Sequence, residues 1–153
     1  MKNLLLLLLF LPLLNFSQTK EIQDIPFAVV EIPPAMPGCE DEDNTRPLDE
    51  DNEPLQSKRS LCTSQQITKF VQRKFNTDLA GDLGLSGRQR ISVIFKINKS
   101  GDVVGVRSRA PHPRLEKEAA RVINMLPKMK PGRQRGKAVI VPYSLPITFQ
   151  VQD

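Results

Sequence analysis

The stretch that decides the fold is RISVIFKIN, from Arg90 to Asn98. Its residues alternate between an apolar and a polar face, with Ile91, Val93, Phe95 and Ile97 on one side and Arg90, Ser92 and Lys96 on the other. This period of two predicts a β-strand that is buried on one face. The next four residues, KSGD, have the composition of a turn, so residues 103–109 are expected to return as the second strand of a hairpin.

Two helices are expected around this hairpin. Residues 63–75 carry apolar side chains at helical spacing, and Thr63 begins a sequence with the spacing of a capping box. Further on, Pro113 suits the first turn of a second amphipathic helix, which Pro127 would end. Three glycines in residues 81–87 indicate a loop between the first helix and the hairpin.

The last segment, residues 139–151, has the longest alternation in the chain. Its apolar face would comprise Val139, Val141, Tyr143, Leu145, Ile147, Phe149 and Val151. Pro142 and Pro146 fall on the other face, and because a proline cannot donate to a neighbouring strand, the segment is expected at a sheet edge or bent. The order of elements predicts an α+β fold, a small antiparallel three-stranded sheet with two helices packed on one face.

The first residues have the pattern of a secretory signal. A basic start at Lys2 precedes an apolar run of 11 residues, Leu4–Leu14, and Ser17 offers a small residue for cleavage. A membrane-spanning helix needs roughly 20 apolar residues, so we expect residues 1–17 to be a cleaved signal peptide. The alternative is a retained membrane anchor.

The only two cysteines are Cys39 and Cys62. In an exported chain an even pair is most simply a disulfide, and the alternative is two free buried thiols. We expect residues 18–61 to form an extended proline-rich arm and an acidic loop that the disulfide closes, and residues 62–153 to form the folded domain. With no further cysteine and a single histidine, the pair cannot build a zinc site.

Charge is distributed unevenly along the chain. The formal net charge is +5, yet residues 40–53 contain eight acidic side chains and one basic side chain. One loop concentrates basic residues, namely Lys128, Lys130, Arg133, Arg135 and Lys137. This basic surface is either a solvated face or a site for an anionic envelope polymer. Export and the scarcity of aromatic residues argue against nucleic acid as a partner.

The sequence contains no pattern typical of catalysis or of cofactor binding. His112, the only histidine, lies between two prolines with no nucleophile or carboxylate at a readable spacing. The acidic run lacks the glycine and glutamate positions of an EF-hand. We therefore expect a binding protein that is not an enzyme and uses no cofactor or metal.

Several segments, in this order and spacing, resemble the C-terminal domain of the TonB energy transducers. They are RISVIFKI (90–97), GDV (101–103), LEKEA (115–119), MKP (129–131), GKAV (136–139) and PITF (146–149). Upstream, PFAVVE (26–31) and PGCE (37–40) resemble the lead-in of the Bacteroidetes-type members. The resemblance covers residues 62–152.

This resemblance implies a periplasmic interaction module of TonB-dependent transmembrane transport. Such a domain pairs with an extended segment of an outer-membrane receptor or another envelope transport protein, and an edge strand can accept that segment by strand addition. By position, the peptide-binding residues would be Val139, Val141, Tyr143, Ser144, Leu145 and Ile147.

Other interpretations stay open at this point. The chain could be a complete energy transducer with a retained anchor, or a scaffold that binds peptidoglycan or lipopolysaccharide through the basic surface. The prolines of the last strand could serve only to prevent edge-to-edge aggregation, and the same edge could pair with a second copy of the chain to form a homodimer.

Overall fold

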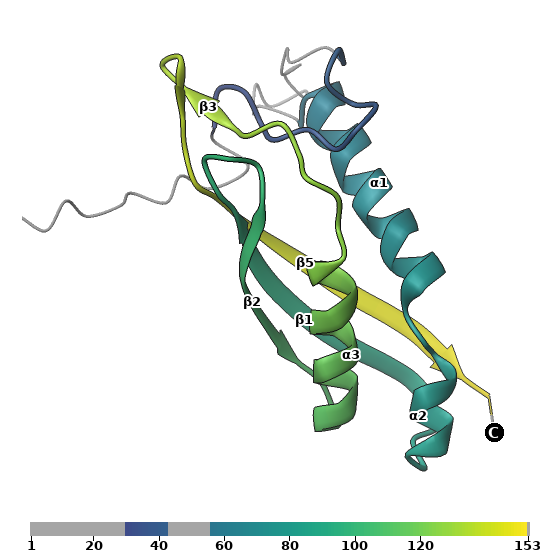
Figure 1. The fold of residues 1–153 in the computed structure, drawn as a ribbon. Helices are drawn as coiled ribbons and strands as arrows, with labels where there is room; N and C mark the ends of the chain where they lie inside the picture. The colour runs from purple at the N-terminus through teal and green to yellow at the C-terminus, as the bar shows by residue number, and fades with distance from the viewer. Residues whose placement is uncertain (1–29, 43–55, 153) are drawn as a thin grey trace, which may run out of the picture.

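A computed structural model of the chain describes residues 30–42 and 56–152 (Figure 1). The expected signal peptide, the apolar residues Phe27 and Val29 of the arm, and most of the acidic loop lie outside the described residues. The helices and strands are α1 (Lys58–Lys74), α2 (Asp78–Asp82), β1 (Gly87–Ile97), β2 (Val103–Arg109), α3 (Pro113–Asn124), β3 (Arg133–Gln134), β4 (Lys137–Ala138) and β5 (Val141–Val151).

The strands β2, β1 and β5 form an antiparallel sheet in that order, with β1 in the middle. β1 and β5 pair over their whole length, from Ile97 opposite Val141 to Gly87 opposite Val151. The helices α1 and α3 lie on the same side of the sheet (Figure 1). The predicted α+β fold with a three-stranded antiparallel sheet is thus confirmed.

The core lies between the sheet and these helices. The alternation predicted for β1 is observed, since Ile91, Val93, Phe95 and Ile97 are buried while most residues between them are exposed. Leu115 and Ala119 of α3 are buried against them. Burial of each large aliphatic or aromatic side chain contributes about 1.5–3 kcal/mol, so this layer dominates the stability of the domain.

The first helix begins earlier than predicted. α1 starts at Lys58, and the Ser57 hydroxyl caps it by accepting a hydrogen bond from the Ser60 amide (3.3 Å). Thr63, the predicted cap, is a buried residue inside the helix whose hydroxyl donates to the Pro34 carbonyl (3.2 Å). The capping-box spacing was therefore misleading, because the threonine hydroxyl binds the arm instead of the helix end.

One helix and one two-stranded hairpin were not predicted. The short helix α2 occupies part of the expected glycine loop and buries Ala80. The basic loop contains the small hairpin of β3 and β4, whose turn places Arg135 and Gly136 at positive φ (49° and 72°). The Val139 amide donates to the Gly132 carbonyl (3.0 Å), so Val139 is attached to the basic loop. The last strand accordingly begins two residues later than predicted, at Val141.

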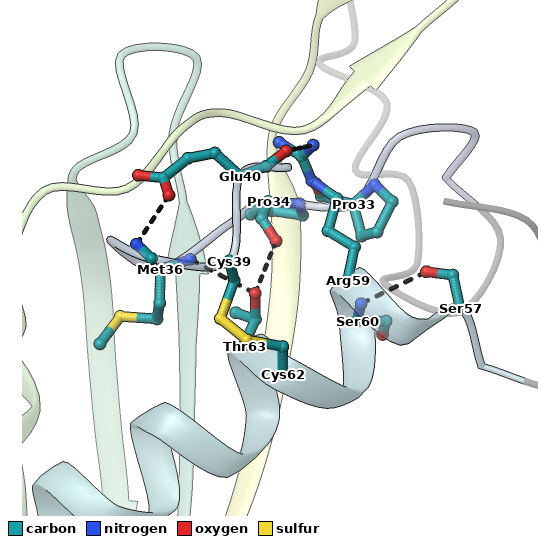
Figure 2. The surroundings of a disulfide bond; sticks show 11 residues. Pro33, Pro34, Met36, Cys39, Glu40, Ser57, Arg59, Ser60, Cys62 and Thr63 are labelled. Atoms are coloured by element: carbon teal, nitrogen blue, oxygen red, sulfur yellow. Dashed lines mark hydrogen bonds between the residues drawn. A yellow bond between two sulfur atoms is a disulfide. The ribbon is translucent and has the colours of Figure 1, made fainter. Parts of the chain in front are cut away.

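The described part of the arm, residues 30–42, is attached to the domain at several points. Ile32 forms a β-bridge with Arg133, and Ala35 forms another with Lys130. Cys39 is joined to Cys62 at the start of α1 by a disulfide, with 5.8 Å between the Cα atoms (Figure 2). The predicted disulfide is confirmed.

Candidate functional site: the outer edge of β5

β5 is an edge strand in the part of the chain that the structure describes, because the sheet order gives it β1 as its neighbour on one side. In an antiparallel pair, successive residues direct their peptide groups alternately toward the partner strand and away from it. Which residues of β5 face outward therefore depends on the phase of this alternation.

The two prolines indicate that phase. Pro142 lies opposite Lys96 and Pro146 opposite Ser92, so both prolines occupy equivalent positions of the ladder. A proline has no amide hydrogen, and the ladder stays intact only if these positions point away from β1. Ser144, which lies between them, must then direct its amide and carbonyl outward as well.

The hairpin turn gives the same phase independently. The Asn98 amide donates to the Asp102 carbonyl across the turn (2.9 Å), which directs the even-numbered residues of β1 toward β2. The odd-numbered residues of β1 then face β5, and they lie opposite odd-numbered residues of β5. The peptide groups of the even-numbered residues of β5 consequently face the outer edge, where Ser144, Thr148 and Gln150 supply amide donors.

The positions for pairing therefore differ in part from those expected from the sequence. Val141, Tyr143, Leu145 and Ile147 direct their peptide groups toward β1, and Val139 precedes the strand. Ser144 is the expected residue whose peptide group faces outward. Thr148 and Gln150 also direct their peptide groups outward and were not among the expected residues, although the even spacing of the two prolines already indicated this phase.

A polar stripe of α1 runs beside this edge. Ser64, Thr68 and Gln72 are four residues apart, so they lie on one side of the helix. Thr68 and Gln72 line a hollow of about 200 Å³ together with residues 145–148 of β5. The outer edge of β5 is thus bordered by hydroxyl and amide side chains.

A larger hollow of about 530 Å³ lies at the beginning of β5. It is lined by Gln56, Ser64, Ile94, Phe95, Lys96, Gly105, Arg107, Pro142, Tyr143 and Ser144. These residues come from α1 and its leading residues, and from all three strands of the sheet. The hollow therefore extends from the start of the α1 stripe past the edge of β5 to the face of the sheet opposite the helices. We call the two hollows together the edge groove.

Tyr143 connects the two sides of the edge groove. Its hydroxyl lies 2.7 Å from the Ser64 hydroxyl, and its ring stacks on Phe95 with 5.1 Å between the centroids. Burial raises the pKa of the Tyr143 hydroxyl above its ordinary value, and the hydrogen bond to Ser64 opposes this shift only in part. Tyr143 is therefore a neutral residue that fixes α1 relative to β5.

The predicted basic surface lies on the segment between α3 and β5. All five of its residues, Lys128, Lys130, Arg133, Arg135 and Lys137, are exposed. The Lys128 ammonium is 3.5 Å from an Asp102 carboxylate oxygen, and the Arg135 amide donates to a Glu31 carboxylate oxygen (2.6 Å). The segment is thereby tied to the hairpin turn and to the arm.

His112 has a structural role at the start of α3. The Nδ1 atom of His112 accepts a hydrogen bond from the Arg114 amide (3.1 Å) and caps α3. Across residues 30–42 and 56–152, no group of three or more His, Cys, Asp or Glu residues gathers where it could hold a metal ion. In the same ranges no helix has the length and apolar character that a membrane crossing requires.

Comparison with known families matches the part of the chain that carries this edge. The family model described as the Gram-negative bacterial TonB protein C-terminal matches residues 78–151, from α2 to the end of β5. No curated protein matches the chain. TonB C-terminal domains are periplasmic, non-enzymatic modules of TonB-dependent transport that interact with outer-membrane receptors. Residues 78–151 of this chain belong to the TonB C-terminal domain family.

Proposed function

We propose that this periplasmic domain binds an extended segment of an outer-membrane TonB-dependent receptor, or of another envelope transport protein, by strand addition along β5. The observation that carries the proposal is the position of β5 at the sheet edge, with the phase of its pairing to β1. An incoming strand would accept hydrogen bonds from the outward amides of Ser144, Thr148 and Gln150. Main-chain bonds of this kind supply affinity without requiring one particular sequence.

The polar stripe of α1 supports the same function. A strand added outside β5 would run beside Ser64, Thr68 and Gln72, whose side chains both donate and accept hydrogen bonds. Peptide groups and polar side chains of the guest on that side would then find partners after leaving water. This matters because a buried polar group without a partner costs about 1–3 kcal/mol.

Pro142 and Pro146 limit what can pair with this edge. Each removes one outward donor, so a guest strand finds fewer hydrogen bonds than on an uninterrupted edge. If two copies of β5 paired in antiparallel fashion, both strands would lack these donors. The prolines thus favour a foreign strand with a complete set of amides over a homodimer.

A pair of substitutions at one position tests the proposal. Ser144→Pro removes the outward amide and inserts a ring at the edge, while Ser144→Ala keeps the amide and removes only the hydroxyl. Outer-membrane extracts are passed over immobilised protein, and bound TonB-dependent receptors are identified by mass spectrometry. We expect wild type and Ser144→Ala to retain a receptor and Ser144→Pro to lose it.

The size of the effect is then measured with a synthetic peptide of the receptor's periplasmic segment. Leaving one guest carbonyl without a donor costs about 1–3 kcal/mol, so Ser144→Pro should weaken binding by roughly 5- to 150-fold. Circular dichroism establishes that the variant is folded. Unchanged affinity in a folded Ser144→Pro variant would exclude strand addition at this edge.

The exposed basic surface supports a second candidate, a scaffold that binds anionic peptidoglycan or lipopolysaccharide. Sedimentation with purified sacculi that weakens as salt rises, and that is lost when Arg133 and Lys137 become Gln, would favour this function. A third candidate is a complete energy transducer that keeps its first segment as an anchor. N-terminal sequencing of the mature protein distinguishes a cleaved signal peptide from that anchor.

A further inference from the structure

The face of the sheet opposite the helices carries an array of arginines. Residues directly opposite each other in a sheet point to the same face, and Arg107 lies opposite Ile94, while Arg109 lies opposite Ser92. Arg88 and Arg90 alternate with the buried residues of β1 and so share that face. All four arginines are exposed. We call this surface the open face.

No acidic partner of these four arginines is found among residues 30–42 and 56–152. Within the described residues, none of their side chains takes part in an ion pair or a hydrogen bond, and the strands β1, β2 and β5 contain no aspartate or glutamate. Like charges on neighbouring strand positions repel one another and destabilise a sheet. An anionic ligand on the open face would relieve this repulsion.

Apolar side chains lie among these charges. Ile94 is 48% exposed and Val104 is 38% exposed, two of the four large apolar residues that the described structure leaves exposed. Val104 lies opposite Lys96, which places it on the open face with Ile94. Next to Ile94, Gly105 adopts a φ of 63° and contributes no side chain, which opens the larger hollow of the edge groove toward this face.

We infer that the open face docks on an anionic phospholipid membrane surface. A guanidinium forms paired hydrogen bonds with phosphate oxygens, and aliphatic side chains such as Ile94 and Val104 enter the boundary between head groups and acyl chains. An acidic peptide would follow one line across the sheet. The charges instead occupy two strands and extend along β1, as a planar partner requires.

This docking is compatible with strand addition but does not depend on it. The arginines of the open face lie on β1 and β2, whereas the guest strand would lie outside β5, at the far edge of the sheet. The helices cover the opposite face (Figure 1). A domain held on a membrane through its open face would keep the outer edge of β5 available to a receptor segment.

Vesicle sedimentation of the purified chain tests the inference. Vesicles of phosphatidylcholine mixed with phosphatidylglycerol should bind the wild type, and vesicles of phosphatidylcholine alone should not. Each cation near an anionic surface contributes about fivefold to binding, so Arg90→Gln with Arg107→Gln should bind about 25-fold more weakly. Arg88→Gln with Arg109→Gln is a second variant with the same expected loss, should the first one fold poorly.

A matched control has the same loss of charge on the other layer. Arg114 and Lys117 are exposed residues of α3, and changing both to Gln should weaken vesicle binding by less than about threefold. Equal losses in the control and in the open-face variants would overturn the inference in favour of a net-charge effect. Binding to polyglutamate that depends on the arginines, without any binding to vesicles, would overturn it in favour of an acidic polypeptide.

Discussion

Reduction of the Cys39–Cys62 disulfide should lower the free energy of unfolding by about 3 kcal/mol. The two residues are 23 positions apart, and the chain-entropy model gives about 3.4 kcal/mol for a loop of that length at 25 °C. For a domain of this size such a loss lowers Tm by roughly 10–20 °C. Urea titration followed by circular dichroism, with and without dithiothreitol, measures the difference directly.

A double variant separates the covalent link from the chemistry of the reagent. Cys39→Ala with Cys62→Ala should be close in stability to the reduced wild type and should not respond to dithiothreitol. Hydrogen exchange should also report where the loss occurs. After reduction the arm is held only by non-covalent contacts such as the bridges of Ile32 and Ala35. The amides of these two residues should therefore exchange faster, whereas the amides of β1 should still exchange only through global unfolding.

A change of less than about 1 kcal/mol in the free energy of unfolding on reduction would show that the disulfide does not act by restricting the unfolded chain. In that case the non-covalent contacts of the arm would have to keep its end near α1 even in the unfolded ensemble. The hydroxyl of Thr63, which donates to Pro34 and accepts from the Met36 amide, is the first such contact to remove (Figure 2).

Three further substitutions test other parts of the fold. Gly101→Ala should cost about 3 kcal/mol or more in urea titration, because φ is 89° and a Cβ atom would lie 1.8 Å from the Met129 carbonyl oxygen. Tyr143→Phe should cost about 1 kcal/mol by the same assay through its lost hydrogen bond to α1. Because burial raises the pKa of Tyr143, the contribution of its hydroxyl to the free energy of unfolding is fully present below about pH 10 and is lost as the pH rises further. Tyr143→Phe should therefore lose less stability than wild type in alkaline denaturation. A hydrogen bond from Arg121 lowers the pKa of Glu118, so Glu118→Gln should be less stable than wild type near neutral pH, and the difference in thermal melts should vanish as pH falls through the range where Glu118 protonates.

The central hairpin could be predicted from the sequence because its signal is local. Burial on one face forces a period of two, and β1 displays it along the strand, whereas β2 departs from it once, at the register shift opposite Ile94 and Lys96. α2 could not be predicted in this way. It is five residues long and includes Gly81, so its helical conformation depends on packing of Ala80 in the core. Tertiary contacts of this kind outweigh intrinsic helix propensity.

The candidate site could be predicted only in part, for a related reason. The sequence indicated that the last strand lies at an edge, because Pro142 and Pro146 cannot donate to a neighbour. Which of its residues face outward required the pairing with β1, and the bordering stripe required the position of α1 beside β5. The spacing of Ser64, Thr68 and Gln72 was readable in the sequence, but its meaning depends on contacts between distant segments.

The disulfide and the edge groove are connected through α1. The family match begins at residue 78, so α1 and the arm lie outside the matched range, yet α1 supplies the polar side of the groove. Cys62 is two residues before Ser64, and its bond to Cys39 holds this turn of α1 against the arm, while Tyr143 holds the same turn against β5. The start of α1 is therefore fixed from both sides. If a guest strand adds to β5 as proposed, it would meet a preformed side of the groove and less conformational entropy would be lost on binding, so the disulfide would raise the affinity of an edge that it does not touch.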